Sequence, residues 1–302
     1  MGEFVTGYGP WAVVTGAAQG VGLAFTEALI ARGLGVVMVD VGPRVTDVAA
    51  ALGDERSARP LVADLANPLW IDALEEATDQ LEVGLAVANA GVAFVGRYLD
   101  MDPGRRRAIL EVNCTATVDL ASWALPAMVE RGRGGFVATS SGSALAGTGG
   151  VALYSATKAF SVNLIEALGW ELADSGVDTL AVVAPTMDTP MFRSGGADPA
   201  RACAPPVDPR VVVEGALDAL PSGGRWLADE GLAFAAGVDR AERVAMMSTA
   251  TTAMYPNTPP LSTTCTPGCA AEPTPGSCTL VGAGPGDPEL LRNVVSHLLR
   301  ST

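Results

Sequence analysis

A short apolar strand followed by a glycine turn and a helix constrains the fold of this chain most. Residues 12–14 read as the start of a buried strand, and Gly16, Gly20 and Gly22 follow in the spacing Gly-x-x-x-Gly-x-Gly. The run 23–32 then has helical periodicity. Glycine suits such a turn because the backbone must bend tightly and come close to a ligand. The pattern predicts a unit that holds a pyrophosphate on a helix N-terminus, although the glycines alone also fit a plain turn.

An acidic residue at the end of the next strand supports the pyrophosphate-binding unit over the plain turn. The apolar run 36–39 ends at Asp40, about 20 residues beyond the glycines, where a carboxylate would accept hydrogen bonds from an adenosine ribose. The same charge would repel a 2′-phosphate. Asp40 therefore favours NAD over NADP, and the nearby Arg44 weakens that preference slightly.

A tyrosine and a lysine four residues apart are the second informative feature. Tyr154 and Lys158 stand in the run Tyr-Ser-Ala-Thr-Lys, so a helix places them on one face, one turn apart. A free phenol has a pKa of about 10, and an ammonium held nearby is expected to lower that pKa. Such a pair can pass a proton to or from an alcohol oxygen. The spacing also fits one core tyrosine beside one solvated lysine.

Together with further motifs in order along 15–229, these features resemble the short-chain dehydrogenase/reductase family. Its Asp-Leu pair after the third strand matches Asp64 and Leu65, and its Asn-Asn-Ala-Gly motif matches 88–91 with Ala88 in place of the first Asn. The resemblance implies a nicotinamide cofactor. The matched cofactor positions are Thr15, Gly16, Gln19, Gly20, Val21, Gly22, Asp40, Asp64, Leu65, Asn89, Ala90, Gly91, Tyr154, Lys158, Pro185 and Thr189.

The resemblance also assigns catalytic roles. The family serine usually precedes the tyrosine by 13 residues, which gives Ser141, although Ser140 and Ser143 are adjacent candidates. Tyr154 would act as general acid or base, and Lys158 would stabilise its phenolate and bind the nicotinamide ribose. Ser141 would hydrogen-bond the substrate oxygen. Asn113 would hold a proton-relay water, and its alternative role is a helix-interior side chain bonded to the backbone.

The pattern of apolar runs predicts an α/β fold. Near-continuous apolar strands at 36–39, 85–88, 136–138 and 180–184 alternate with helix-period segments, which are 68–81, 105–130 and 155–173. Aromatic residues make up only 5% of the chain, which suits a buried parallel sheet. We therefore expect a doubly wound parallel sheet, the three-layer αβα Rossmann fold, with its ligand at the carboxyl ends of the strands.

The substrate is less visible in the sequence. We expect the 187–210 loop after the sixth strand to close over it, and a set of apolar side chains on two loops to line it: Val92, Phe94, Met187, Met191 and Phe192. These side chains favour a lipophilic secondary alcohol or ketone, but they also suit simple packing of the loop. The family's Pro-Gly appears as Pro185-Thr186, so the backbone near the nicotinamide is expected to differ.

The net charge and the rare residue types argue against several other classes of protein and site. The net charge of −14 disfavours a nucleic-acid partner. No secretory signal or transmembrane-length apolar run is visible, so a cytoplasmic protein without a membrane partner is expected. A single histidine, His297, disfavours a Ser-His-Asp hydrolase and a histidine-rich metal site. The spacing of Cys265, Cys269 and Cys278 matches no zinc pattern, and no metal site is expected.

The C-terminal part departs from the family pattern. We expect one Rossmann-fold domain over 1–247, a Pro/Thr-rich and poorly ordered linker over 248–278, and a short remnant with a glycine turn and helix over 279–302. The run 279–291 resembles the opening of tetrapyrrole methylases, which bind S-adenosylmethionine. Only 11 residues follow that run, too few for such a domain.

Three functional hypotheses follow. The first is an NAD-dependent short-chain alcohol dehydrogenase or ketoreductase. The second is a catalytically silent nicotinamide-nucleotide-binding regulatory protein on the same fold. The third is a fragment of a bifunctional protein with a methyltransferase. The resemblance implies a homodimer or homotetramer, and the apolar positions Phe160, Leu164, Leu168 and Trp170 favour association through their helix, although they also fit core packing.

Overall fold

A computed structural model of the whole chain describes residues 2–256. Residue 1 and residues 257–302 lie outside the described part. Several expectations fall on those residues and are therefore outside the described part. They concern His297, the three clustered cysteines, the methylase-like run and most of the linker.

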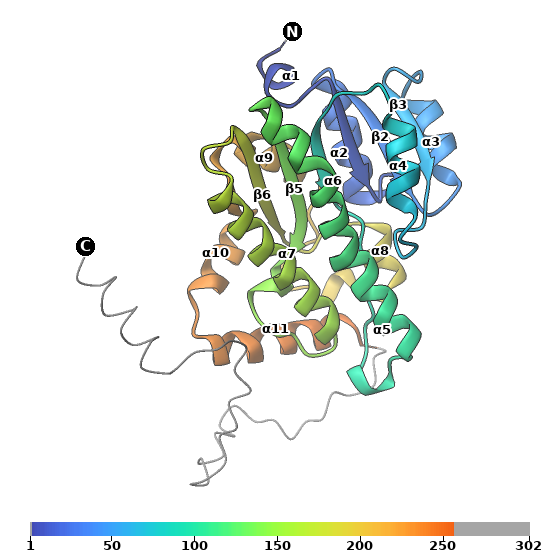
Figure 1. Cartoon of the computed structure of the whole chain (residues 1–302). Coiled ribbons are helices and arrows are strands. Elements are labelled where there is room, and N and C mark those ends of the chain that lie inside the picture. The colour runs from blue at the N-terminus through green and yellow to red at the C-terminus, as the bar shows by residue number, and fades with distance from the viewer. Residues whose placement is uncertain (1, 257–302) are drawn as a thin grey trace, which may run out of the picture. The chain divides into compact units, whose positions relative to one another are not determined.

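A seven-stranded parallel sheet forms the centre of the described chain (Figure 1). Its strand order is β3-β2-β1-β4-β5-β6-β7, so the chain crosses from one edge to the middle after β3. The strands are β1 (Trp11–Thr15), β2 (Gly35–Asp40), β3 (Ala58–Val62), β4 (Val83–Ala88), β5 (Gly134–Ser141), β6 (Val177–Ala184) and β7 (Gly224–Leu227). The strand order reverses between β1 and β4, which opens a crevice at their carboxyl ends. The expected doubly wound sheet is confirmed.

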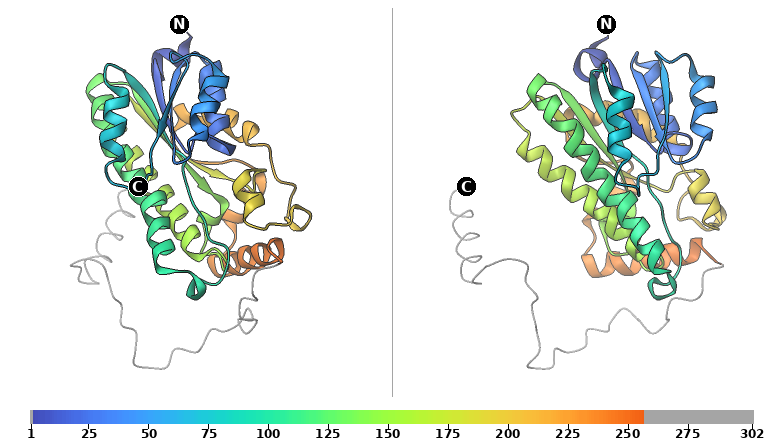
Figure 2. Two further views of the ribbon diagram at one scale, coloured as in Figure 1. Left: turned by 90° about the vertical axis from the view of Figure 1, so that its right-hand side faces the viewer. Right: turned by 45° about the vertical axis from the view of Figure 1, so that its right-hand side comes forward.

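Helices cover both faces of the sheet (Figure 2). One apolar cluster packs α2 (Gly20–Ala31), α3 (Arg44–Leu52) and α9 (Pro209–Ala219) on one face. A second packs α4 (Trp70–Thr78), α6 (Ala116–Arg131) and α7 (Ala152–Glu171) on the other. Alternate residues of the central strands supply the two clusters; in β5, Val137 faces the first while Phe136 and Ala138 face the second. The shorter helices are α1 (Glu3–Tyr8), α5 (Pro103–Leu110), α8 (Pro190–Ser194) and α10 (Glu230–Gly237).

Two helical segments differ from the sequence prediction. The segment 105–130, expected as one helix, is α5, a π-helical turn at Glu111–Thr115, and α6. The first residues of the expected linker, from 248 on, are helical instead, because α11 (Arg240–Met254) runs through that position. Residues 248–254 are Ser, Thr, Ala and Met, which a packed helix tolerates, and Pro256 follows the helix end.

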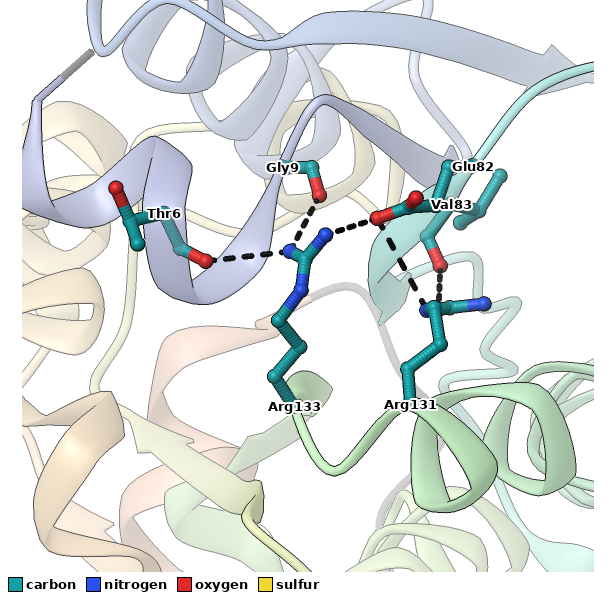
Figure 3. Close-up of polar contacts among 6 residues, drawn as sticks. All are labelled: Thr6, Gly9, Glu82, Val83, Arg131 and Arg133. Carbon is teal, nitrogen blue, oxygen red and sulfur yellow. Dashed lines mark hydrogen bonds and ion pairs between the residues drawn. The ribbon is translucent and has the colours of Figure 1, made fainter.

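A polar clasp holds α1 at the amino-terminal edge of the sheet (Figure 3). The Arg133 guanidinium donates to the carbonyl oxygens of Thr6, at 3.2 Å, and Gly9, at 3.1 Å. The same guanidinium pairs with the Glu82 carboxylate. The clasp lies before β1 and β5 begin, so it supports the edge opposite to the strand ends at which ligands bind in such folds.

No helix within residues 2–256 is long and apolar enough to cross a membrane. The same residues contain no group of three or more His, Cys, Asp or Glu side chains arranged to hold a metal ion.

Candidate functional site

The glycine turn leads directly from β1 into α2. Gly16 and Gly20 have φ values of +67° and +56°, which a side chain would strain. Gly22 packs so tightly that a Cβ there would lie 2.1 Å from the Gly16 carbonyl oxygen. The N-cap residue Gln19 makes no side-chain hydrogen bond to the helix, and Val21 lies in its first turn. The first N–H groups of α2 therefore lack a side-chain cap and suit an anionic ligand.

Thr15 and Asn89 lock this turn to the end of β4. The Thr15 hydroxyl accepts hydrogen bonds from the backbone N–H of Asn89, at 3.0 Å, and of Ala90, at 3.1 Å. The Asn89 amide donates to the Thr15 carbonyl oxygen at 3.0 Å. Both polar side chains are used within the protein, so their role in this structure is to fix the loops around a ligand position.

The acidic residues lie at the carboxyl ends of β2 and β3. The two carboxylate oxygens of Asp40 accept hydrogen bonds from the backbone N–H of Ala18, at 3.0 Å, and of Gly42, at 3.2 Å. Asp40 is therefore held beside the glycine turn while remaining partly exposed. Asp64 is exposed and caps the turn that follows it, and its neighbour Leu65 is buried.

Tyr154 and Lys158 lie one turn apart on α7, and Lys158 is buried. The Lys158 ammonium lies 5.7 Å from the centroid of the Tyr154 ring and donates to the Thr139 carbonyl oxygen at 2.8 Å. Burial lowers the pKa of Lys158 to about 8, and the nearby Cys114 thiol acts in the opposite direction.

The pKa of Tyr154 moves in the direction opposite to that expected from the sequence. Burial raises it to about 12, while the Ser141 hydroxyl lowers it and Tyr255 raises it further. Desolvation of the phenolate thus outweighs the Ser141 hydrogen bond in the protein alone. A Tyr154 base needs additional positive charge near the phenol.

The three adjacent serines have different environments. Ser140 is buried, and its hydroxyl donates to the Lys158 carbonyl oxygen at 2.8 Å, which ties β5 to α7. Ser141 ends β5, accepts from the Ser143 N–H at 3.3 Å, and lies close enough to Tyr154 to affect its pKa. The Ser143 hydroxyl is buried without a hydrogen-bond partner. Among the three, Ser141 is the hydroxyl placed beside the phenol.

Asn113 lies buried in the π-helical turn. Its carbonyl Oδ1 accepts from the Val92 N–H at 2.8 Å, and its Nδ2 donates to the Val92 carbonyl oxygen and to Thr157 Oγ1, both at 3.0 Å. Both amide protons are therefore used. A water held by this residue would have to bind its backbone carbonyl oxygen, which also accepts from Thr117 Oγ1 at 3.2 Å.

The segment after β6 folds back toward the glycine turn. Pro185 and Thr186 follow the strand, and Thr186 is absent from the residues with positive φ, so the threonine that replaces the family's glycine is not in the left-handed region. The Thr189 hydroxyl accepts from the Phe192 N–H at 3.2 Å and so caps α8. A Cβ on Gly20 would lie 3.5 Å from the Thr189 side chain, so the two segments meet.

The expected substrate residues differ in how exposed they are. Phe192 is 8% exposed, and Met187 packs against the cluster formed with α2 and α9. Val92 and Met191 are 38% and 43% exposed. The Arg105 guanidinium lies over the Phe94 ring, 5.3 Å from the centroid of that ring. Val92 and Met191 are thus exposed, and Phe94 and Met187 are partly exposed.

Sequence reasoning missed two residues near the site. Thr157 bridges Asn113 to α7, and Tyr255 follows α11, where a Cβ on Gly195 would lie 3.4 Å from its ring. Tyr255 affects the pKa of Tyr154. No sequence signal pointed to Tyr255, because it lies in the segment interpreted as linker. Thr157 lay inside the Tyr-Ser-Ala-Thr-Lys run but had no assigned role.

A cavity of about 420 Å³ adjoins the other side of the glycine turn. It lies between α2 and the 187–210 loop, and its lining includes Gly20, Glu27, Asp188, Asp208 and Arg210. The Arg210–Glu27 pair, at 3.1 Å, spans it. Since neither Tyr154 nor Lys158 lines this cavity, it is separate from the proton-handling pair.

The residues present fit a dinucleotide. The glycine turn leaves helix N–H groups without a side-chain cap, and Asp40 stands at the neighbouring strand end. The Lys158 ammonium has three donors, and one is used by Thr139. A Cβ on Gly91 would lie 3.4 Å from this ammonium, so the absence of a side chain there keeps the adjacent space open.

Comparisons with known proteins agree with this arrangement. A family model described as short chain dehydrogenase matches residues 10–200. Oxidoreductase UcpA of Escherichia coli is 30% identical over 226 residues, which cover 73% of this chain and 83% of that protein. A short-chain dehydrogenase from Sphingobium yanoikuyae, solved in complex with NADPH, has a TM-score of 0.68 and 28% identity and covers 74% of this chain and 89% of its own.

A human protein is also similar over a shorter region. The "Inactive hydroxysteroid dehydrogenase-like protein 1" of Homo sapiens is 32% identical over 181 residues, or 58% of this chain. The chain spans 55% of the length of that relative.

Proposed function

This chain belongs to the short-chain dehydrogenase family, and we propose that it transfers a hydride between the CH–OH group of an alcohol and NAD. The observation that carries the proposal is the arrangement of Tyr154, Lys158 and Ser141 at the joined ends of α7 and β5. A phenol, an ammonium and a hydroxyl at one place can together handle the proton of an alcohol.

Tyr154 is the proposed general acid or base. In the direction of alcohol oxidation its phenolate takes the hydroxyl proton. When bound, oxidised nicotinamide would supply the hydride acceptor and a positive charge that favours the phenolate. That charge is needed because burial raises the pKa of Tyr154 to about 12 in the protein alone. Lowering this pKa to about 7 requires roughly 7 kcal/mol of differential stabilisation.

The neighbouring side chains hold and move the proton. Lys158, still largely cationic near pH 7 because its pKa is about 8, stabilises the phenolate and offers its remaining donors to ribose hydroxyls. Ser141 donates to the substrate oxygen and orients it. The Asn113 backbone carbonyl would hold the water that connects Lys158 to solvent.

The proposed cofactor is NAD rather than NADP. Its support is the Asp40 carboxylate, which is fixed by the N–H groups of Ala18 and Gly42 and would repel a 2′-phosphate. The structure of the Sphingobium relative contains NADPH, so that relative does not favour NAD and the proposed choice rests on Asp40.

The proposed substrate is a lipophilic secondary alcohol or ketone. The partly open apolar side chains of Val92, Phe94 and Met191 support this class. The word hydroxysteroid in the human relative's name agrees with it. The proposed assembly is a cytoplasmic homodimer or homotetramer, supported by Trp170 and Phe160, which are 86% and 38% exposed on α7.

A catalytically silent nucleotide-binding protein is the second candidate. The human relative is named inactive, and the raised pKa of Tyr154 weakens the base in the protein alone. The presence of Ser141, Tyr154 and Lys158 together supports the enzyme instead.

A substrate panel separates these candidates. The purified protein is incubated with NAD and a series of alcohols that runs from small polyols to steroid-like secondary alcohols, and absorbance at 340 nm is followed. Turnover of apolar alcohols is expected. Turnover of polyols alone would overturn the substrate class, and cofactor binding without any turnover would favour the silent protein.

A further inference from the structure

A single hydroxyl, that of Thr157, joins the π-helical turn to the catalytic turn of α7. Thr157 is 1% exposed and lies between Tyr154 and Lys158 in the sequence. Its Oγ1 accepts from Asn113 Nδ2 at 3.0 Å and donates to the Tyr154 carbonyl oxygen at 2.8 Å. Through these two hydrogen bonds, Thr157 links Asn113 to Tyr154, which are 41 positions apart in the chain.

The hydroxyl is the third contact that fixes the Asn113 amide, beside the two from the Val92 backbone. The other amide proton of Asn113 and its Oδ1 are bound to the Val92 backbone, so Thr157 supplies the remaining partner. Removing that partner would leave a buried donor unsatisfied, which costs about 1–3 kcal/mol and favours rearrangement of the amide.

The orientation of Asn113 bears on Lys158 because the two share one space. A Cβ built on Gly91 would lie 3.4 Å from Lys158 Nζ and 3.5 Å from Asn113 Oδ1. The partial negative charge of an amide oxygen on this side favours the ammonium form of the lysine. The titratable groups that face Lys158 are Tyr154 on its own helix and Cys114 in the π-helical turn.

We propose that Thr157 is a positioning residue: its hydroxyl steadies the Asn113 amide with the amide oxygen on the Lys158 side, and thereby keeps the lysine charged and aligned with Tyr154. The inference rests on the proposed function for its catalytic consequence. Its electrostatic consequence holds in the protein without any cofactor or substrate.

The sequence provides a direct readout, because Lys158 is the only lysine in the chain. Protein labelled with ¹³C at lysine Cε gives a single lysine resonance, whose pH titration measures the pKa of Lys158. The test compares wild type, Thr157→Val, Thr157→Ser and the control Thr78→Val. Thr78 is also buried and donates to a carbonyl of its own helix, Leu74, at 2.6 Å, but on α4.

Thr157→Val is expected to lower the pKa of Lys158 by at least about 0.5 unit, and Thr157→Ser and Thr78→Val to leave it unchanged. With a substrate found in the panel, kcat should fall about tenfold in Thr157→Val while the KM for NAD stays within twofold. If Thr157→Val does not fold, Thr157→Ala gives the same comparison.

An unchanged Lys158 pKa in Thr157→Val or Thr157→Ala would overturn the inference and leave Thr157 with a packing role. A shifted pKa in a protein that turns over no alcohol would support the positioning contact while refuting the proposed function. The two failures are therefore distinguishable.

Discussion

The ammonium of Lys158 donates a hydrogen bond to the backbone carbonyl of Thr139 across 2.8 Å. This contact joins the middle of α7 to the carboxyl end of β5, two residues before Ser141. It holds a cation 5.7 Å from the Tyr154 ring in the protein alone. The arrangement of the pair is thus built into the fold, and its chemistry can be tested one residue at a time.

Replacing Tyr154 with Phe removes the hydroxyl and keeps the ring. We expect kcat to fall by about 10²–10⁴ because general acid–base catalysis is lost. Binding of NADH, followed by its fluorescence, should change less than threefold. Tyr98→Phe is the control, since Tyr98 is 46% exposed and stacks under Arg106. Full activity of the Tyr154 variant would refute the mechanism.

The stability of the protein should depend on the charge of Lys158. Its pKa is about 8 in the folded protein and about 10.4 in an unfolded chain, so between these values the unfolded state binds more protons. The free energy of unfolding of wild type relative to Lys158→Met should therefore rise by about 3 kcal/mol from pH 7.5 to pH 10.5. Urea unfolding at both pH values measures it. A difference that stays constant with pH would show that burial does not lower this pKa.

Gly22 should not tolerate a methyl group. A Cβ would lie 2.1 Å from the Gly16 carbonyl oxygen, a backbone atom that cannot move without distorting the turn. Gly22→Ala is expected to lower the free energy of unfolding by about 1–3 kcal/mol and to weaken NADH binding. Gly237→Ala is the control. Gly237 lies in α10 with no atom within 4 Å of a Cβ, and alanine there should be neutral or stabilising. Equal stability of the two variants would contradict the close packing.

Asp40 should set the cofactor preference. Asp40→Ser removes the charge expected to repel a 2′-phosphate, so the ratio of kcat/KM for NAD to that for NADP should fall at least about tenfold. The control is Asp47→Asn, which removes a carboxylate from the first turn of α3. If the ratio is unchanged in Asp40→Ser, or falls equally in the control, the cofactor assignment is wrong.

Arg133 should support the fold without affecting the chemistry. Arg133→Met removes the donors to Thr6 and Gly9 and the partner of Glu82, so the free energy of unfolding should drop by about 1–3 kcal/mol (Figure 3). The kcat should stay within twofold of wild type. Arg225→Met, which breaks an exposed pair with Glu166 at 3.6 Å, should change stability little. A large loss of kcat in Arg133→Met would show that the clasp acts on the site.

Much of the fold was predictable because it depends on local patterns. The apolar runs at 36–39, 85–88, 136–138 and 180–184 all lie within strands of the parallel sheet. The π-helical turn at Glu111–Thr115 was not predictable, because the helical periodicity continues across it and only contacts with Val92 and Thr157 reveal its role.

The candidate site was also predictable only in part. Spacing alone identified Tyr154 and Lys158 as neighbours on one helix, and the glycine pattern identified the turn that carries Gly16 and Gly22. The direction of the Tyr154 pKa shift was mispredicted, since the spacing shows the neighbouring cation but not the burial that opposes it.

The sequence by itself determined the family, the parallel sheet and the residue types that meet at its carboxyl edge, because these follow from periodicity and short spacings. The tertiary structure decided which hydroxyls are free and which carboxylates are fixed. It also decided that α11 brings Tyr255, the residue after its end, close to the site. Those properties depend on burial and on hydrogen bonds between residues distant in the chain, such as Asn113 and Thr157. Desolvation, which the sequence does not display, then determines how the charges behave.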